Sequence, residues 1–234
     1  MKKSSKGRFL GILGGMGPEA GIEFAKILIE KTPARKDQEH LPFLLLNYPK
    51  VPDRTAFILG KGPDPVPEIV EGLKIMERAG VSHAVIPCNT AHAFLERIEN
   101  KTSIFLYNIL QESFLFAKEK LKVKRLGLLA TKGTIASGIY EKYFVGFTLI
   151  KPESEEEEFV HKAIYEAAKI CEMTRAASEL KKAAFKLVEK GAEAVILGCT
   201  EIETALRKEQ FPFPVIKPME ITAEKILKDF KGEK

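Results

Sequence analysis

The stretch AVIPCNTAH (84–92) carries an apolar run into a cysteine, and AVILGCTEI (194–202) does the same in the second half of the chain. A short apolar run bounded by small and polar residues is typical of a buried strand that leads into a helix. Cys88 and Cys199 therefore each follow the carboxyl end of a predicted strand. Because ligands bind at that edge of open α/β sheets, the two stretches predict a functional site.

Both stretches belong to an internal repeat. GVSHAVIPC (80–88) matches GAEAVILGC (191–199), with the glycine and the cysteine at the same spacing. Further upstream, LGILGGMG (10–17) matches LGLLATKG (126–133) at two leucines and two glycines. Self-similarity of this kind predicts two structurally similar halves, each of which delivers one cysteine from a strand end.

Apolar runs alternate with amphipathic segments along the whole chain, which predicts an α/β fold. The runs are almost continuously apolar, as in parallel strands that are covered on both faces. We expect two similar doubly wound domains with mainly parallel sheets, related by pseudo-symmetry, and an active site in the cleft between them. The predicted first domain comprises residues 1–103 and 211–234, and the second comprises residues 104–210. We expect strands at 8–13, 43–48, 82–87, 103–108, 124–131, 147–152, 193–198 and 212–217.

Helices are expected at 18–31 and 66–80, from 90, from the end of the fourth strand to about 121, over 154–190 and after the last strand. The segment 47–68 is rich in proline and glycine and is predicted to be a long loop. Loops of this length in a compact domain are usually functional. We therefore expect the segment to contribute to the site.

Composition excludes several classes of protein. Lysine and glutamate are interleaved, so the formal net charge of +5 gathers into no basic stripe and nucleic-acid binding is not expected. No run approaches the roughly 18 apolar residues of a membrane span. The apolar part of the N-terminus is too short for a secretory leader and is broken by GGMGPEAG (14–21). Three cysteines without framework spacing indicate a reduced, cytoplasmic setting.

Two thiols that face one cleft suggest a particular chemistry. One thiolate can remove a proton from a carbon atom while the other thiol delivers a proton to the opposite face, which inverts a stereocentre. CNT (88–90) and CTE (199–201) both lie where a helix is expected to begin. Helix N-termini favour negative charge and can lower a thiol pKa, so a thiolate base is reasonable at either position.

Five motifs resemble the aspartate/glutamate racemase family, and specifically its aspartate racemase branch. In chain order they are GILGGMGPEA (11–20), KDQEHLPFLLLNYPKVPDRT (36–55), IPCNTAH (86–92), GLLATKGTIASGIY (127–140) and LGCTEI (197–202). The resemblance covers nearly the whole chain. It implies a cofactor-independent enzyme that interconverts L- and D-aspartate, acts on a small amino-acid substrate and forms a homodimer.

The resemblance also implies roles for individual residues. Cys88 and Cys199 match the two catalytic thiols. The groups that hold the α-carboxylate and ammonium of the substrate match Asn89, Thr90 and Thr200. The loop that closes on the substrate matches Thr131 and Thr134, and Met16 lines the floor. The cationic pair for the distal carboxylate matches Arg54 and Lys162.

Other interpretations remain open. Either cysteine alone would be read as an inert buried thiol, and Cys171 has no matching partner and is expected to be structural. His92 and His161 could tune a thiol, although positions on a helix surface are favoured for both. The glycine-rich segment after residue 10 fits neither nucleotide-binding spacing, and no ligand set has zinc spacing, so neither a cofactor nor a metal is expected.

The alternatives for function are a racemase of glutamate or of a broader acidic range, another reaction on the same scaffold, and a non-catalytic ligand-binding relative.

Overall fold

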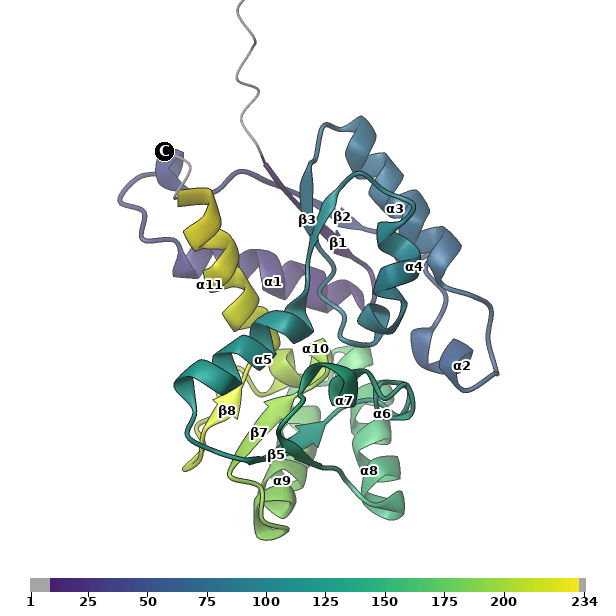
Figure 1. The fold of residues 1–234 in the computed structure, drawn as a ribbon, viewed down its shortest axis with the longest axis vertical. Helices are drawn as coiled ribbons and strands as arrows, with labels where there is room; N and C mark the ends of the chain where they lie inside the picture. The colour runs from purple at the N-terminus through teal and green to yellow at the C-terminus, as the bar shows by residue number, and fades with distance from the viewer. Residues whose placement is uncertain (1–8, 232–234) are drawn as a thin grey trace, which may run out of the picture.

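The structure is a computed structural model that describes residues 9–231. It has two lobes, each built around one four-stranded parallel sheet (Figure 1). The strand orders are β2-β1-β3-β4 and β6-β5-β7-β8. The strands are β1 (Leu10–Gly14), β2 (Phe43–Asn47), β3 (His83–Val85), β4 (Phe105–Tyr107), β5 (Arg125–Leu129), β6 (Thr148–Ile150), β7 (Ala194–Leu197) and β8 (Val215–Ile216). The predicted fold class is confirmed.

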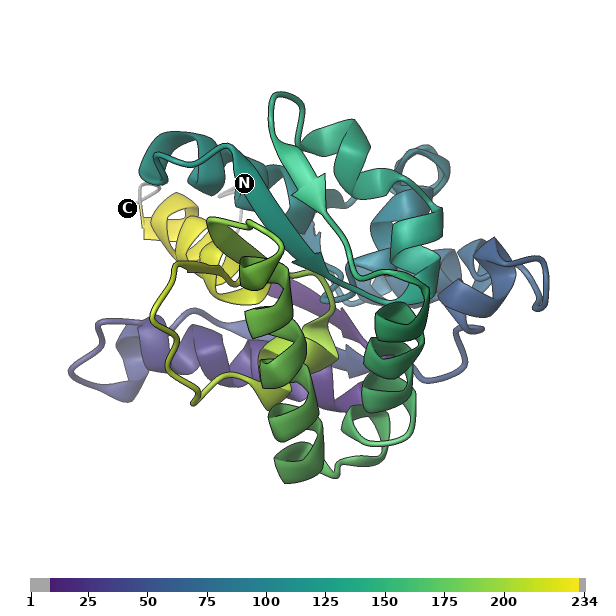
Figure 2. The same ribbon diagram turned by 90° about the horizontal axis from the view of Figure 1, so that it is seen from below.

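Helices connect the strands and cover both faces of each sheet. Figure 2 shows α8 and α9 side by side on one face of the second sheet. The helices are α1 (Pro18–Lys31), α2 (Arg54–Ile58), α3 (Val66–Arg78), α4 (Leu95–Glu99), α5 (Ile109–Lys120), α6 (Lys132–Ala136), α7 (Ile139–Tyr143), α8 (Ser154–Tyr165), α9 (Met173–Glu189), α10 (Thr200–Ala205) and α11 (Pro218–Lys231). Three short 3-10 helices complete them: η1 (Asp37–Glu39), η2 (Thr90–Phe94) and η3 (Ala168–Ile170). No helix in the described range is both long and apolar enough to cross a membrane.

The two sheets repeat one topology, as the sequence repeat predicts. β1 and β5 occupy the same position in their sheets, and so do β3 and β7. Because all strands of a sheet are parallel, the carboxyl ends of these four central strands mark one edge of each sheet. Each half therefore presents an equivalent edge at which loops can carry functional side chains.

The predicted division of the chain is wrong for two strands. β4 pairs with β3 in the first sheet, although the prediction assigned residues 104–210 to the second domain. β8 pairs with β7 in the second sheet, although residues 211–234 were expected to return to the first. Each strand follows its neighbour through a short helical crossover, so the repeat also includes the fourth strand of each sheet. Residues 1–8, which include the basic part of the considered leader and the start of the expected strand 8–13, lie outside the described range.

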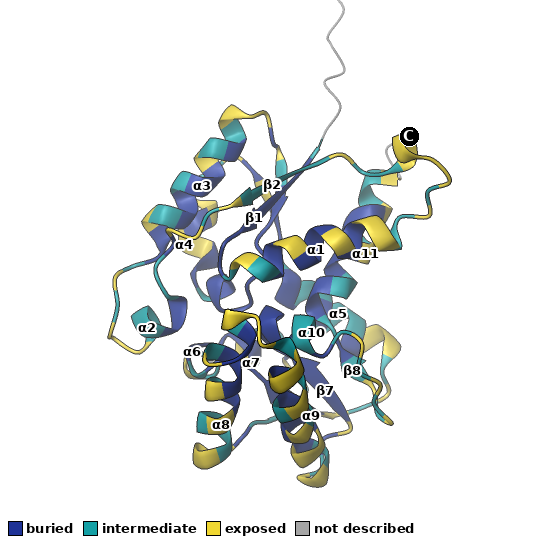
Figure 3. Ribbon diagram, turned by 180° about the vertical axis from the view of Figure 1, so that it is seen from behind, coloured by how far each residue is buried: buried dark blue, intermediate teal, exposed yellow. Residues whose placement is uncertain are grey.

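Three apolar cores hold the molecule together. One lies under α3 in the first half and one under α8 and α9 in the second. The third runs through both halves, and Phe24 of α1, Leu128 of β5 and Met219 of α11 all belong to it. Figure 3 shows the buried strands inside and the exposed outer faces of α8 and α9. Because α11 packs on both α1 and α5, the shared core joins the two halves.

Short helices α2, α6 and α7 were not predicted. Each has five residues, so no apolar periodicity could develop over the 11 to 18 residues that such a reading needs. α2 lies inside the expected long loop, and its N-terminus begins at Arg54. This placement brings Arg54 to the carboxyl edge of the first sheet, on the side that faces the second half.

The loop after β1 depends on one glycine. Gly15 has φ +96°, and an added Cβ would lie 2.3 Å from the backbone of Tyr48. We expect Gly15→Ala to lower the free energy of unfolding by about 3 kcal/mol or more, because a left-handed backbone cost and a steric clash add together. Gly60→Ala is the matched control: Gly60 has φ +71° with nothing within 4 Å, so only about 1–2 kcal/mol should be lost. Chemical denaturation measures both, and equal losses would contradict the close approach at Gly15.

Candidate functional site

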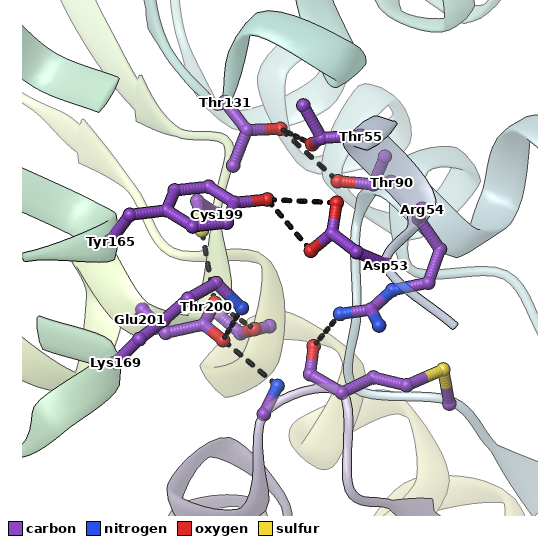
Figure 4. A network of polar contacts seen from close by, with 12 residues as sticks. Asp53, Arg54, Thr55, Thr90, Thr131, Tyr165, Lys169, Cys199, Thr200 and Glu201 are labelled. Carbon is purple, nitrogen blue, oxygen red and sulfur yellow. Dashed lines mark hydrogen bonds and ion pairs between the residues drawn. The ribbon is translucent and has the colours of Figure 1, made fainter. Parts of the chain in front are cut away.

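A small cavity lies where the carboxyl ends of the two sheets face each other (Figure 4). It brings together side chains that follow β1, β2 and β3 in the first half and β5, α8 and β7 in the second. The lining residues are Met16, Arg54, Thr55, Cys88, Asn89, Thr90, Thr131, Tyr165, Lys169, Cys199, Thr200 and Glu201. Eight of the ten predicted site residues are among them; Thr134 and Lys162 are not.

A larger open groove of ≈ 620 Å³ lies between α1, α9 and α10. Its charged side chains pair largely with each other: Arg207 bonds to Glu23, and Lys181 bonds to Glu209. No cysteine or histidine lines it. The chemistry therefore points to the smaller cavity as the candidate site.

Cys88 reaches the cavity from the end of β3 and is buried. Its backbone N–H donates to the carbonyl of Ile86 at 2.7 Å, which turns the chain out of the strand. The expected helix follows as η2 and α4. Arg54 also lines the cavity, and its guanidinium interacts with the Cys88 thiol.

The side chain of Arg54 is buried and rigidly held. Its two terminal nitrogens donate to the carbonyls of Met16 at 2.9 Å and Pro52 at 3.1 Å. Burial lowers the pKa of Arg54, but Cys88 and the nearby carboxylates of Asp53 and Glu201 outweigh burial, and the net direction is upward. Nε has no hydrogen-bond partner within the described range. Arg54 is therefore a fixed cation whose Nε is available to bind a ligand.

Cys199 is the N-cap residue of α10 and is also buried. Its sulfur donates a hydrogen bond to Oε2 of Glu201 at 3.0 Å. Burial raises the pKa of Cys199 well above its usual value, and the carboxylate of Glu201 raises it further, while Lys169 opposes the rise. Cys199 is consequently held as a thiol, whereas Cys88 faces a guanidinium.

Glu201 is the centre of the polar network in the cavity, and the sequence reading missed its role. Its Oε1 accepts hydrogen bonds from Gly17 N at 2.8 Å and Lys169 Nζ at 3.2 Å, while its Oε2 accepts from Cys199 and Thr200. Burial raises the pKa of Glu201, but Lys169 and these hydrogen bonds lower it to about 2. The glycine-rich loop before α1 thus binds a carboxylate of the second half. The available signal was an acidic residue directly after CT in LGCTEI (197–202).

The predicted second cation is at a different position. Lys162 projects from the outer face of α8, where its side chain is 56% exposed and lies 4.0 Å from Glu158. Lys169, in η3, reaches into the cavity and lies 3.2 Å from Glu201. The structure places Lys162 outside the cavity because it lies on the exposed face of α8, whereas Tyr165 at the end of that helix lines the cavity. No helical periodicity marks Lys169, so no sequence pattern pointed to it.

Four threonine hydroxyls meet across the cleft. Thr90 shares hydrogen bonds with Thr134 at 2.7 Å and with Thr131 at 3.3 Å, and Thr131 lies 3.3 Å from the hydroxyl of Thr55. Thr131 also caps α6 by accepting from the backbone N–H of Thr134 at 3.2 Å. Thr134 therefore lies behind the cavity wall and supports Thr90 and Thr131, which line it.

Asn89 combines one bonded atom with one free atom. Its Oδ1 accepts from the hydroxyl of Tyr140 at 2.8 Å, which fixes the orientation of the amide. Its Nδ2 is buried and has no hydrogen-bond partner within the described range. Since buried donors are nearly always paired, Asn89 Nδ2 and Arg54 Nε are candidate donors to a ligand carboxylate.

Neither histidine next to a motif lines the cavity. His92 is buried rather than on a helix surface; its Nδ1 lies 2.9 Å from the carbonyl of Cys88, and its Nε2 accepts from Ile109 N at 3.3 Å. Burial lowers the pKa of His92 to about 4, so it is neutral and ties the Cys88 turn to α5. His161 stacks on Tyr165 with ring centroids 4.3 Å apart. No group of three or more metal-ligating side chains occurs within residues 9–231.

The thiol–carboxylate pair yields a direct test. In a chain that carries Cys88→Ser and Cys171→Ser, Cys199 is the remaining cysteine. We expect Glu201→Gln to lower the pKa of Cys199, because it removes a negative charge beside the sulfur while keeping the shape of the side chain. Thiolate ultraviolet absorbance measured against pH reports the change. Glu23→Gln, which alters a carboxylate outside the cavity, should leave the titration unchanged, and an unchanged titration in Glu201→Gln would contradict the pairing.

Comparison with known proteins agrees with this geometry. The family model described as Asp/Glu/Hydantoin racemase matches residues 13–226. The broad specificity amino-acid racemase RacX of Bacillus subtilis is 25% identical over 224 residues, which cover 88% of this chain and 91% of the relative.

Among solved structures, the Picrophilus torridus aspartate racemase superimposes with a TM-score of 0.85 at 28% identity and covers 96% of this chain and 95% of its own. A glutamate racemase from Francisella tularensis in complex with D-glutamate has a TM-score of 0.66 at 17% identity, with coverage of 97% and 82%, and shares the fold. Because the family match spans nearly the whole chain and both halves of the cavity, the chain belongs to the Asp/Glu/hydantoin racemase family and is an amino-acid racemase.

Proposed function

We propose that the protein interconverts L- and D-aspartate without a cofactor, with Cys88 and Cys199 as the two proton-transfer groups. The observation that carries this proposal is the delivery of one thiol from each half into the same cavity, together with the cations Arg54 and Lys169. A cavity built only to bind an amino acid needs no cysteine from either half. The similarity to an aspartate racemase supports the same assignment.

The environments of the thiols suggest their starting roles. Cys199 keeps its proton, donates a hydrogen bond to Glu201 and begins as the acid, while Cys88 beside Arg54 begins as the base. When Cys88 takes the α-proton, the electron pair left on the α-carbon is delocalised into the carboxylate, and Cys199 then protonates the opposite face. No net proton is gained or lost, and the two sulfurs exchange protonation states. The reverse reaction starts from the exchanged pair.

Substrate binding follows from the donors that remain free. Asn89 Nδ2 and Arg54 Nε are buried donors without partners within the described range, and Thr90, Thr131 and Thr200 add hydroxyls. Arg54 offers a planar fork to a carboxylate, and Lys169 a flexible point charge. We propose that these groups hold the two carboxylates and the ammonium of aspartate. Met16 forms the apolar floor.

A broader substrate range is the second candidate, since the relative from Bacillus subtilis is named as a broad specificity amino-acid racemase. The two cations favour an acidic side chain, and glutamate differs from aspartate by one methylene. Initial rates on aspartate, glutamate, asparagine and alanine separate the candidates. A faster rate on alanine than on both acidic substrates would overturn the aspartate assignment.

The setting and assembly are proposed from the same family resemblance. We propose a homodimer that works in the reducing cytoplasm, where the three free cysteines would remain reduced. Light scattering on the purified chain measures the assembly.

The two-thiol assignment predicts the behaviour of single variants. We expect Cys88→Ser and Cys199→Ser each to lower racemisation of aspartate by roughly a thousandfold or more, because general acid–base catalysis contributes about that factor. Each variant should retain solvent exchange of the α-proton of one enantiomer only, since one base survives. Proton NMR in deuterated water detects both effects. Racemisation at the parental rate in either variant would contradict the two-base mechanism.

The corrected cation assignment makes a paired prediction. We expect Lys169→Ala to reduce kcat/KM for aspartate by roughly a hundredfold, because a buried charge pair that loses one partner costs about 2–4 kcal/mol. Lys162→Ala, the matched control on the solvent face of α8, should keep the parental value. Arg54→Ala should resemble Lys169→Ala. Steady-state kinetics with circular dichroism measure all three, and a loss confined to Lys162→Ala would reverse the correction.

A further inference from the structure

We infer that the hydrogen bond from Tyr165 to Asp53 is a contact that holds the cleft closed, so that Tyr165 acts as a positioning residue for both cations. The inference rests on the proposed function, because it assigns the closed state to a racemase cycle. It concerns two residues that neither the repeat nor the predicted site included. The bond joins α8 of the second half to the N-terminus of α2 in the first.

The cleft is closed in this structure. The free volume between the lining side chains is ≈ 10 Å³, which is room for about one water molecule. Both thiols are buried, with Cys88 4% and Cys199 5% exposed. An amino acid is much larger than a water molecule, so substrate can enter and leave only when the two halves move apart. Some contact across the cleft must therefore break and re-form in every turnover.

The Tyr165–Asp53 bond has the geometry of such a contact. The hydroxyl of Tyr165 lies 2.9 Å from Oδ2 and 3.2 Å from Oδ1 of Asp53. Burial raises the pKa of Tyr165, so the hydroxyl stays protonated and remains a donor at neutral pH. Hydrogen bonds to an ionised carboxylate are stronger than those between neutral groups. Figure 4 shows the two side chains meeting directly at the cavity.

Asp53 and Tyr165 each also make a contact that helps to position one of the two cations. Asp53 accepts from the backbone N–H of Ala56 at 2.7 Å, which caps α2 at the residue before Arg54. The ring of Tyr165 lies under Lys169, whose Nζ is 5.0 Å from the ring centroid. One bond thus couples the closed position of the second half to the positions of Arg54 and Lys169.

Other contacts also form across the closed cleft. α2 packs so closely on α6 that an added Cβ on Gly133 would lie 2.5 Å from the Cα of Thr55. The hydroxyls of Thr55 and Thr131 are 3.3 Å apart, and both are neutral. The backbone N–H of Gly17 also donates to Glu201 between the two halves. Among the bonds between two described side chains across the cleft at the cavity, the Tyr165–Asp53 bond has the charged acceptor, so its loss should increase opening.

The experiment measures cleft opening without measuring catalysis. The full chain carries Cys171→Ser, which removes the exposed cysteine, and iodoacetamide then alkylates Cys88 and Cys199 only when the cleft opens. Tyr165→Phe keeps the ring beneath Lys169 and removes the hydroxyl alone. The matched control is Tyr107→Phe, which removes a tyrosine hydroxyl that lies 3.3 Å from a different carboxylate, that of Asp229, outside the cavity. Peptide mass spectrometry follows the rate at each cysteine.

We expect alkylation in Tyr165→Phe to be roughly tenfold faster than in Tyr107→Phe, the change that follows from losing one hydrogen bond to a charged group. Aspartate kcat/KM should fall by a similar factor in Tyr165→Phe alone, because the closed state that aligns both cations is less populated. Equal alkylation rates in the two variants would overturn the inference. So would a loss of racemisation in Tyr165→Phe with no change in alkylation.

A second variant guards against a folding defect in the first. Asp53→Ser keeps a side chain that can cap α2 but is too short to reach Tyr165. It should also increase alkylation, and the double variant Asp53→Ser/Tyr165→Phe should be no faster than Tyr165→Phe, because both changes remove the same bond. Additive rates in the double variant would overturn the inference. Failure of the proposed function would appear separately, as absent racemisation of aspartate in the unmodified chain.

Discussion

A single buried carboxylate connects the reactive edges of the two sheets. Glu201 accepts hydrogen bonds from Gly17 in the first half and from Lys169, Cys199 and Thr200 in the second. A buried charge is stable only when it is paired and hydrogen-bonded, and these four contacts meet that condition. The position of the glycine-rich loop, the reach of Lys169 and the protonation of Cys199 therefore depend on one another.

The backbone is nearly symmetric, but the charges around the two thiols are not. β3 and β7 occupy equivalent positions and each leads to a cysteine, which is the arrangement needed to reach both faces of one carbon atom. Cys88 lies beside Arg54, whereas Cys199 lies beside Glu201. A strictly symmetric site would leave both thiols in the same state. Opposite neighbours give one acid and one base at the start of each turnover, and the symmetric backbone lets these roles exchange.

Sequence reasoning was strongest where the signal repeats and weakest where the chain turns sharply. The repeat around Cys88 and Cys199 predicted two similar parallel α/β halves and brought both cysteines to strand ends, because strand ends are set by local apolar runs. The other six predicted residues that line the cavity came from the family resemblance. The predicted domain division misassigned β4 and β8, because their short apolar runs do not indicate which sheet each strand joins. Sequence reasoning chose Lys162 over Lys169 because a motif match cannot show which face of α8 is exposed. Glu201 and Tyr165 act through contacts with the other half, and such contacts leave no local pattern in the sequence.

The central claim is that two different groups serve the two faces of the substrate carbon. The most direct measurement is the isotopic content of both enantiomers during the earliest turnovers of the unmodified enzyme with L-aspartate in deuterated water. The account predicts deuterium at the α-carbon of the D-aspartate formed, while the remaining L-aspartate keeps its proton, because Cys88 and Cys199 each exchange with solvent but act on opposite faces. Deuterium appearing equally early in both enantiomers, or D-aspartate that retains the original proton, would show that one base serves both faces and would contradict the account.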